Sequence, residues 1–463
     1  MLTSTPKNAK QADVVILGAG IVGAVAALAL ARASEELACA ELKVVLIDRG
    51  LPQSPFEQPK SAQGLSESRA EWSPRVSALS LASVALLNEL SLWCPELEER
   101  ACFYRSMRVW ESDGVSELVF DALELGQKKL GCIIENDRLL AVLHQALEAQ
   151  ANVRLLWQTD VERFEVSANS VRLTLAHQAQ VLQAQILVGA DGLRSRIRQL
   201  GCFNVDSKPY QHQALISHLK CTRGHGDQAR QVMTPTGPVA FLPLTAPEDE
   251  NHWVSLVWSG PDDEIQALSS LSDSDFLAAL TPWVPGDLAS VIECTQRYTY
   301  PLQCLQVDEV VQDRVVLIGD AAHVVHPLAG LGVNLGLADV ACLSRVLTER
   351  FRKGLDLGEI NGLRAYQRQR KPHTKAVVTV TDQLQRLYQR PMSAGLKVLS
   401  SQGLSWLNDL NILKRLLVQL ATLAGPDWPY VANASDIKGR STIENRSSTR
   451  NTIKNKEPID DEF

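Results

Sequence analysis

A glycine-rich turn between a short buried strand and a helix constrains this chain of 463 residues more than any other feature. Residues 13–17 (DVVIL) are typical of a buried parallel strand, and GAGIVG at 18–23 leads into an alanine-rich helical stretch. Residues 43–47 (KVVLI) predict a second strand, which ends at Asp48. Strand, glycine turn, helix and strand make a βαβ unit, so the sequence predicts an α/β fold.

The three glycines of this turn have the spacing that dinucleotide binding requires. Gly18 permits a tight turn, Gly20 lets backbone N–H groups approach a pyrophosphate, and Gly23 lets helix and strand pack closely. The start of the helix adds a partial positive charge that favours phosphates. Asp48 stands where a carboxylate accepts a hydrogen bond from an adenosine ribose hydroxyl. A glycine turn that serves packing alone is the alternative interpretation.

A second acidic residue follows another buried strand. Residues 314–318 (RVVLI) precede Gly319 and Asp320, and a long helix is predicted over 332–351. An aspartate at this point can bond a polyol, and the glycines after it expose backbone N–H groups where the helix begins. Such a helix start suits a reduced flavin, whose N1/C2 carbonyl region carries negative charge. A nicotinamide dehydrogenase needs no such element, so the pattern favours FAD over NAD.

β-rich sequence separates these nucleotide-binding elements, which predicts interleaved domains. We predict a Rossmann-like FAD-binding domain built from 1–75, 133–203 and 301–375, and a β-rich substrate domain at 204–300. Residues 76–132 are predicted to supply a linking helix (77–92) and further substrate-domain strands. C-terminal helices are predicted at 376–431 and a disordered tail at 432–463.

Composition excludes several other classes of protein. A formal net charge of -7, without a basic run interleaved with aromatic residues, argues against a nucleic-acid binder. The nine cysteines are scattered without a CxxC pair, which argues against a disulfide framework and a zinc site. His323 and His326 are spaced like metal ligands but have no third ligand nearby, so we expect no metal. Reduced cysteines favour a cytoplasmic location.

Three motifs in order along the chain resemble those of the flavoprotein aromatic hydroxylases with the para-hydroxybenzoate hydroxylase fold. They are GAGIVG at 18–23, the DG motif GADGLRS at 189–195, and the GD motif at 319–320. Other stretches resemble the ubiquinone-biosynthesis branch: SPRVSALSLAS at 73–83, IIEN at 133–136, FLPL at 241–244 and GDAAHVVHPLAGLGVNLG at 319–336. Within that branch, the resemblance is strongest to the enzyme that hydroxylates C5 of an early polyprenylphenol. Three stretches carry this resemblance: MRVWES at 107–112, PYQHQALI at 209–216 and ARQV at 229–232.

The resemblance implies a role for individual residues. Cofactor-binding roles fall on Gly18, Gly20, Gly23, Asp48, Arg75, Asp191, Gly192, Gly319 and Asp320, and the isoalloxazine environment on Pro327, Gly330, Gly332 and Asn334. Asp191 belongs to a motif also linked to NAD(P)H use, although without its motif it would be interpreted as a helix cap. Phe241 and Pro243 are our choice for a wall of the substrate pocket. Ser73, Asn136 and Leu331 depart from the residues common in the wider fold.

The reaction implied is hydroxylation of a phenol ring without a catalytic side chain. NAD(P)H would reduce FAD, and oxygen would form a flavin C4a-hydroperoxide that attacks the electron-rich ring. The expected partners are a polyprenylated phenol or quinol, O2 and other ubiquinone-biosynthesis proteins. Contact with the inner membrane is left open, because a leucine stripe over 407–420 is equally explained by core packing. Alternatives are another ring position, a different aromatic hydroxylase, or a non-enzymatic carrier, in which degraded cofactor motifs would be expected.

Overall fold

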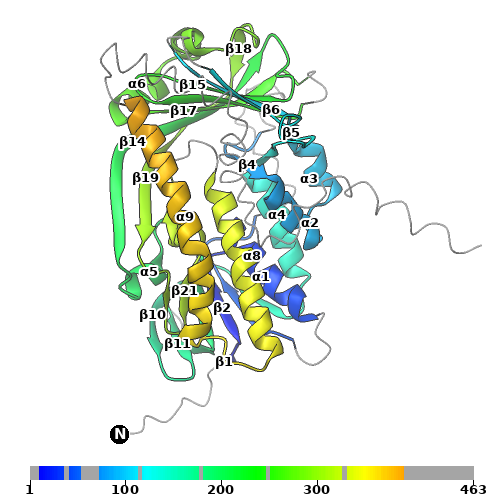
Figure 1. Cartoon of the computed structure of the whole chain (residues 1–463), viewed down its shortest axis with the longest axis vertical. Coiled ribbons are helices and arrows are strands. Elements are labelled where there is room, and N and C mark those ends of the chain that lie inside the picture. The colour runs from blue at the N-terminus through cyan, green and yellow to red at the C-terminus, as the bar shows by residue number, and fades with distance from the viewer. Residues whose placement is uncertain are drawn as a thin grey trace, which may run out of the picture.

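The computed structural model describes residues 10–35, 41–53, 72–112, 117–176, 181–246, 251–325 and 331–389. A parallel sheet covered by helices occupies one end of the molecule, and a larger sheet lies across the other end (Figure 1). The predicted α/β class with a β-rich second part is therefore confirmed. The C-terminal tail and residues 390–431 of the predicted C-terminal helices, which include the leucine stripe, lie outside the described residues.

The described helices and strands have the following bounds. The helices are α1 (Ile21–Glu35), α2 (Leu81–Glu89), α3 (Pro95–Arg100), α4 (Asn136–Glu148), α5 (Arg196–Leu200), α6 (Asp262–Ser270), α7 (Asp273–Leu280), α8 (Leu331–Arg352) and α9 (Ile360–Gln389), with short 3-10 turns η3 (Thr281–Trp283) and η4 (Gly319–Ala321). The strands are β1 (Lys10–Gln11), β2 (Val14–Leu17), β3 (Val44–Ile47), β4 (Val76–Ser80), β5 (Cys102–Tyr104), β6 (Ser106–Glu111), β7 (Glu117–Asp121), β8 (Gly131–Glu135), β9 (Val153–Leu156), β10 (Val161–Val166), β11 (Val171–Leu175), β12 (Val181–Ala184), β13 (Ile186–Gly189), β14 (Val205–Cys221), β15 (Gln228–Met233), β16 (Pro238–Pro243), β17 (Trp253–Pro261), β18 (Val291–Cys294), β19 (Tyr298–Val307), β20 (Val311–Gln312), β21 (Val315–Leu317) and β22 (His323–Val324).

The predicted nucleotide-binding strands assemble into one sheet although they are far apart in sequence. Its order is β20-β21-β13-β2-β3-β9, and all neighbours are parallel except β20 and β21. Strands β2, β3, β13 and β21 are buried at every residue, as expected for a parallel sheet covered on both faces. Helices α1, α4 and α8 pack on one face through alanine, leucine and valine side chains.

The β-rich part forms a nine-stranded sheet of order β22-β19-β14-β17-β16-β15-β6-β7, with β18 pairing to β14. One face of this sheet packs against α6 and α7 in a cluster that includes Val239, Trp258 and Phe276. The opposite face contacts the rest of the molecule, because Leu242 and Trp253 pack with Trp72 and Ile133. This face therefore looks toward the parallel sheet. A four-stranded sheet, β1-β12-β11-β10, completes the lower end.

The predicted linking helix begins later than expected. Residues 76–80 form β4, which pairs with β8 in a three-stranded sheet, and only the residues from Leu81 onward are helical. Ser80 caps α2 by accepting a hydrogen bond from the Ser83 backbone N–H at 3.2 Å. Leucine and alanine at helical spacing favoured a helix over 77–92, but long-range pairing with β8 makes the first residues a strand.

Helices α8 and α9 lie side by side along the front of the molecule (Figure 1). Helix α8 is long and apolar enough to cross a membrane by length and composition. Its apolar residues are largely buried, however, and many of them pack with α1 in the same core cluster. We therefore interpret α8 as a core helix.

Candidate functional site

The three motifs meet at one edge of the parallel sheet. The glycine turn follows β2, the DG motif follows its neighbour β13, and the GD motif follows β21 on the other side of β13. Because parallel strands end at the same edge, Asp191, Asp320 and Asp48 all emerge there. The three motifs, which are far apart in sequence, are therefore neighbours in space.

The glycines of the first turn are required for different reasons. Gly18 has a φ of +107°, and a Cβ there would lie 2.4 Å from the Ala190 carbonyl oxygen. A Cβ on Gly23 would lie 1.9 Å from the Gly18 carbonyl oxygen. By contrast, a Cβ on Gly20 would meet no atom within 4 Å. Gly18 and Gly23 thus allow protein backbones to meet, whereas Gly20 borders open space suited to a close-lying phosphate.

Two side chains hold the residue between the first two glycines. Asp48 Oδ2 accepts a hydrogen bond from the Ala19 N–H at 2.6 Å, and Oδ1 accepts one from the Gly50 N–H at 2.7 Å. His144 in α4 donates through Nε2 to the Ala19 carbonyl at 2.7 Å. Asp48 therefore supports the turn itself, and its remaining lone pairs are free to accept a ribose hydroxyl. His144 had no signal in the sequence, because its partner lies 125 residues away.

Asp191 of the DG motif binds the start of a helix through one carboxylate oxygen and leaves the other without a hydrogen-bond partner among the described residues. Its Oδ2 accepts hydrogen bonds from the Arg196 and Ile197 N–H groups, at 2.5 and 3.2 Å, at the start of α5. Its Oδ1 is buried and has no hydrogen-bond partner among the described residues. Burial raises the pKa of Asp191, although the bonds from Ser195, Ile197 and Arg196 oppose this. Asp191 is a helix cap with one oxygen still available.

Asp320 of the GD motif is accessible to solvent yet closely surrounded by protein. Its side chain is exposed, but burial raises its pKa, and the charges of His323 and Arg75 only partly oppose this rise. A carboxylate that is both reachable and surrounded lies in a concave part of the surface. A Cβ built on Gly332, in the first turn of α8, would be 3.8 Å from Asp320 Oδ1. The GD motif and the first turn of α8 therefore line the same concave part of the surface.

Arg75 lies close to the GD motif, since its charge acts on Asp320. The guanidinium also sits 5.3 Å from the centre of the Tyr300 ring on β19. The segment before Arg75 is tied to both parts of the molecule. The Ser73 N–H donates to Glu135 Oε1 at 2.8 Å, and the Ser73 carbonyl accepts from His218 Nε2 at 2.8 Å. His218 had no signal in the sequence, because its partner Ser73 lies 145 residues away.

Three further contacts complete the clamp around Ser73. Glu135, which is 1% exposed, accepts a hydrogen bond from Arg100 Nε through its Oε2 at 2.8 Å. The Arg100 guanidinium lies 4.4 Å from the centre of the Trp72 ring, and that ring is 6.0 Å from the His218 ring. We name Trp72, Ser73, Arg100, Glu135 and His218 the Ser73 clamp. The clamp fixes the position of Arg75 near the edge of the parallel sheet at which the three motifs meet. We name this edge the cofactor edge.

The clamp predicts a pH dependence of stability. Burial, aided by the charge of Arg100 and opposed by the bond to Ser73, lowers the pKa of His218 to about 4. An unfolded histidine has a pKa of about 6.5, so between these values the unfolded chain binds a proton that the folded chain does not. As the pH falls from 6.5 to 4, His218 alone should therefore lower the free energy of unfolding by about 1.4 kcal/mol for each pH unit. Urea unfolding of wild type and His218→Gln should show a flatter pH slope in the variant; equal slopes would contradict this.

The residues at the start of α8 are in part structural. Asn334, predicted to lie in the isoalloxazine environment, is 2% exposed, and its Oδ1 accepts bonds from Ser80 N–H and Ser83 Oγ at 2.8 and 2.7 Å. Its Nδ2 donates to the Ala78 carbonyl at 2.7 Å. Asn334 therefore anchors the first turns of α8 to β4 and α2. Pro327, Gly330 and His326 lie outside the described residues.

The structure corrects the predicted substrate wall. Phe241 is completely buried in the cluster that packs on α6 and α7, and Pro243 lies on the same face by the alternation of β16. Leu242 points the other way, toward Trp72 and Ile133. Residues 241 and 243 of the FLPL motif therefore face α6 and α7 rather than the parallel sheet. The alternation of side chains along a strand predicts that the sheet has two faces, but it does not identify which face lies next to the cofactor.

A row of side chains, half-buried except for the buried Gln231, crosses the face that looks toward the cofactor edge. The residues are paired across seven neighbouring strands and are mostly apolar: Tyr298, Ile216, Val257, Ala240, Gln231, Val109 and Leu118. We name this row the apolar strip. Tyr300, whose ring lies beneath Arg75, is two residues from Tyr298 on β19. Leu242, which packs on Trp72, is two residues from Ala240 on β16. The strip is a better candidate for the substrate wall than Phe241.

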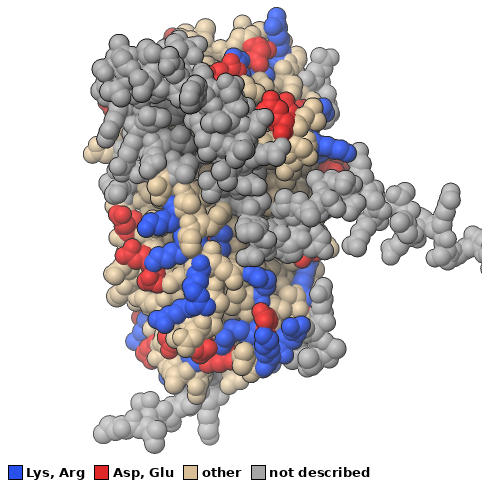
Figure 2. Space-filling view, viewed as in Figure 1, with Lys and Arg blue, Asp and Glu red and all other residues tan. Residues whose placement is uncertain are grey.

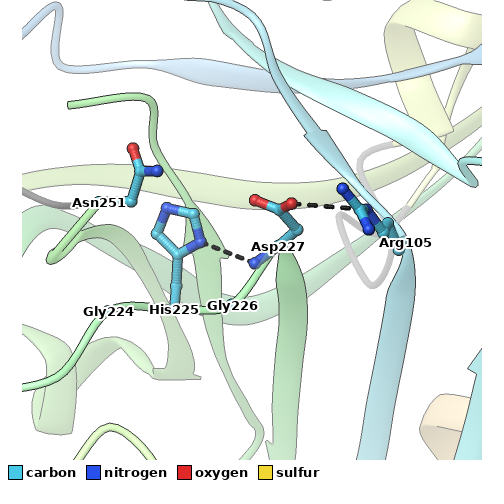
Figure 3. A pocket seen from close by; sticks show the side chains of 6 residues that line it. All are labelled: Arg105, Gly224, His225, Gly226, Asp227 and Asn251. Atoms are coloured by element: carbon cyan, nitrogen blue, oxygen red, sulfur yellow. Dashed lines mark hydrogen bonds and ion pairs between the residues drawn. The ribbon is translucent and has the colours of Figure 1, made fainter. Parts of the chain in front are cut away.

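One trio of potential metal ligands lies elsewhere, beside a pocket of about 440 Å³ (Figure 3). Among the described residues, Cys102, His225 and Asp227 bring their ligand atoms within 4.8 Å of one another. Both ring nitrogens of His225 are engaged, since Nε2 donates to the Leu244 carbonyl at 3.0 Å and Nδ1 accepts from the Asp227 N–H at 3.1 Å. Burial raises the pKa of Cys102 to about 12, which keeps the thiol protonated. The trio is therefore poorly suited to a metal.

The residues at the sheet edge fit a flavin dinucleotide. Gly20 and Gly192 each border open space, so backbone can be approached closely there. Asp191 offers a buried oxygen without a partner, and Asp320 offers a reachable carboxylate beside Arg75. FAD needs such sites for its pyrophosphate, ribose and ribityl chain, and the three adjacent strand ends supply them together.

Comparison with known proteins agrees with this site. The family model described as "FAD binding domain" matches residues 11–381. The chain is 31% identical over 453 residues to the mitochondrial ubiquinone biosynthesis monooxygenase COQ6 of Mus musculus, across 89% of this chain and 90% of that protein. It is 32% identical over 358 residues to the 3-demethoxyubiquinol 3-hydroxylase of Escherichia coli K12, across 77% of this chain and 85% of that protein.

Solved structures show the same fold. The p-nitrophenol 4-monooxygenase PnpA from Pseudomonas putida DLL-E4 aligns with a TM-score of 0.70 at 18% identity, across 90% of this chain and 99% of that chain. PqsL of Pseudomonas aeruginosa, described as a probable FAD-dependent monooxygenase, aligns with a TM-score of 0.67 at 22% identity. The alignment covers 86% of this chain and 100% of that chain. The chain therefore belongs to the FAD-dependent aromatic hydroxylases of the ubiquinone-biosynthesis family, with the para-hydroxybenzoate hydroxylase fold.

Proposed function

We propose that this protein hydroxylates the aromatic ring of a polyprenylphenol during ubiquinone biosynthesis, with C5 as the favoured position. The observation that carries the proposal is the meeting of three cofactor motifs at one sheet edge, opposite the apolar strip. Relatives that are 30–32% identical are named as ubiquinone-pathway monooxygenases or hydroxylases, which supports the substrate class. The preference for C5 is supported only by the sequence resemblance. Another ring position is the alternative.

The side chains at this edge bind and orient rather than react. The turn at Gly18–Gly23 would hold the pyrophosphate, Asp48 the adenosine ribose, and Asp320 the ribityl chain. When bound, FAD supplies the oxygen-activating chemistry, and O2 is the co-substrate. The protein's task is to exclude water and to hold the ring close by. We propose NAD(P)H as the electron donor, by resemblance to the family.

The apolar strip leads to a prediction about substrate binding. Arginine at Val257 would place a charge in the middle of the strip, so the prenylphenol would bind at least about 10-fold more weakly because a buried unpaired charge is costly. FAD affinity should stay unchanged, since Val257 lies on the substrate sheet. Ile292→Arg is the matched control, because Ile292 lies on the same sheet but is 57% exposed. Equal KM values for both variants would argue against the strip as the substrate wall.

We also propose a cytoplasmic protein that touches an anionic membrane surface. Basic side chains gather on the face of the molecule where α8 and α9 lie (Figure 2). On α9 the exposed residues of one stripe are Arg364, Arg368, Lys371 and Lys375, although Lys371 also pairs with Glu309. A prenylated substrate resides in a bilayer, and each basic residue near an anionic surface contributes about 1 kcal/mol. Peripheral contact would bring the enzyme to its substrate.

Vesicle sedimentation tests this contact. Wild type should bind vesicles that contain anionic lipid, and the charge-reversed double variant Arg364→Glu/Arg368→Glu should bind at least about 10-fold more weakly. Because the attraction is electrostatic, binding should also fall as salt increases. Equal binding to neutral vesicles, or no effect of the double variant, would remove the proposal.

Deletion of the gene followed by mass spectrometry tests the function directly. In a cell without redundant hydroxylases, we expect a prenylated precursor that lacks one ring oxygen to accumulate, and its structure would identify the ring carbon. A normal quinone pool without a precursor would refute the ubiquinone assignment. With purified protein, NAD(P)H oxidation stimulated by a prenylphenol, compared with simple phenolic acids, separates this activity from that of a general aromatic hydroxylase.

A further inference from the structure

A buried carboxylate behind the GD motif joins several elements that are far apart in sequence. Asp339 lies in α8 and is 1% exposed. Its Oδ2 accepts hydrogen bonds from the Gly319 N–H at 3.0 Å and from His323 Nε2 at 2.6 Å. Its Oδ1 accepts a bond from Arg370 Nε of α9 at 2.8 Å. One carboxylate thus links α8, α9, β22 and the backbone of the GD motif.

The carboxylate is itself held firmly in its charged state. Burial alone would raise the pKa of Asp339, but the charges and bonds of His323 and Arg370 outweigh it and lower that pKa to about 2. Arg370 is 9% exposed and also donates through Nη2 to the Leu335 carbonyl of α8 at 3.3 Å. Asp339 is therefore an anchored acceptor that presents one oxygen to Gly319.

The backbone that Asp339 holds has little freedom. Gly319 has a φ of +59°, and a Cβ on it would lie 3.1 Å from Val22 Cγ1 of α1. A Cβ on Gly336 of α8 would lie 2.4 Å from Val22 Cγ2 and 3.3 Å from Gly319 Cα. The GD turn is therefore packed between α1 and α8. The next residue along, Asp320, projects to the accessible side.

We propose that Asp339, anchored by Arg370, is a positioning residue that aims Asp320 at FAD through the backbone of Gly319. The proposal rests on FAD binding at this edge and adds a part of the site that no motif contains. Asp339 would contact no cofactor atom. Its effect on FAD should pass entirely through Asp320, which distinguishes a positioning role from a general contribution to stability.

A double-mutant cycle on FAD affinity tests this proposal. Apoprotein is titrated with FAD, and quenching of flavin fluorescence gives Kd for wild type, Asp320→Ala, Asp339→Asn and the double variant. We expect Asp320→Ala to weaken FAD binding about 10- to 100-fold, as for a lost hydrogen bond to a charged group, and Asp339→Asn about 10-fold. In the double variant the loss should scarcely exceed that of Asp320→Ala, because coupled residues are not additive. Losses that multiply would overturn the proposal.

Asp356→Asn is the matched control. Asp356 pairs with the buried Arg314, which lies just before β21, at the opposite end of the strand from Gly319. This variant should lose stability in urea without a change in FAD Kd. If Asp339→Asn behaves in the same way, Asp339 is merely structural and the proposal is wrong.

Milder variants cover the case in which Asp339→Asn does not fold. His323→Leu removes one donor to Asp339 but leaves its bonds to Gly319 and Arg370, and it should weaken FAD binding severalfold. His323→Gln should restore the affinity, because its amide nitrogen can reach the position of Nε2. Weakening that glutamine does not rescue would count against the proposal. A wild-type protein that fails to bind FAD would instead remove the cofactor assignment itself.

Discussion

Replacing Gly23 by alanine should nearly abolish FAD binding and destabilise the protein. The new Cβ would lie 1.9 Å from the Gly18 carbonyl oxygen and 3.0 Å from the Gly18 carbonyl carbon, so α1 must move away from β2. We expect FAD affinity to fall more than about 100-fold, because the turn is built on this close approach. The unfolding free energy should fall by about 1–3 kcal/mol, as for other overpacked sites.

Alanine at Gly20 is the matched control for this effect. A Cβ there meets no protein atom within 4 Å, so folding should be unaffected. It would occupy the space next to which the phosphates are expected to lie, and FAD affinity should fall about 10-fold or more through this clash alone. Urea unfolding of the apoproteins and FAD titration separate the two effects. Loss of stability in Gly20→Ala, or unchanged FAD affinity in both variants, would contradict this account of the turn.

Removing the charge of Glu135 should have the second large effect. Glutamine keeps the shape but leaves the Arg100 guanidinium without its buried anion, and one broken buried pair costs about 3–5 kcal/mol. We expect a loss of about 3 kcal/mol, because Arg100 remains partly exposed to solvent. FAD binding should also weaken, since the Ser73 clamp that carries Arg75 would loosen.

An exposed ion pair provides the comparison for Glu135. Glu349 and Lys353 lie four residues apart on α8 and the following turn, and each side chain is about half exposed. Glu349→Gln should change the unfolding free energy by less than about 0.5 kcal/mol. Chemical denaturation of both variants measures the difference. Similar small losses in the two would show that the clamp is dispensable.

The sequence allowed the cofactor edge to be predicted because its signals are local. Each of the three motifs combines a buried strand with a glycine or an acidic residue at its end, and parallel strands bring their ends together. Asp48, Asp191 and Asp320 each follow such a strand, so their common edge could be inferred from the sequence alone. The helix-cap interpretation of Asp191 also proved correct for one of its oxygens.

The remaining parts of the site depend on contacts between distant segments. His144 reaches Ala19 across 125 residues, and His218 reaches Ser73 across 145. No local pattern signals such partners. Phe241 shows a different limit, because β16 is buried on both faces in places and its alternation does not identify the substrate side. Asp339 had no motif, since its importance arises from α8, α9 and the GD motif packing together.

Titration of the purified apoprotein with FAD tests the central claim most directly. The three strand ends should bind a single FAD per chain, give a yellow protein with a flavin absorption spectrum, and lose affinity when Gly20 or Asp320 is replaced by alanine. A colourless protein whose fluorescence titration shows no saturable binding would contradict the claim. So would full affinity in both variants, because FAD would then lie somewhere other than the edge that joins these motifs.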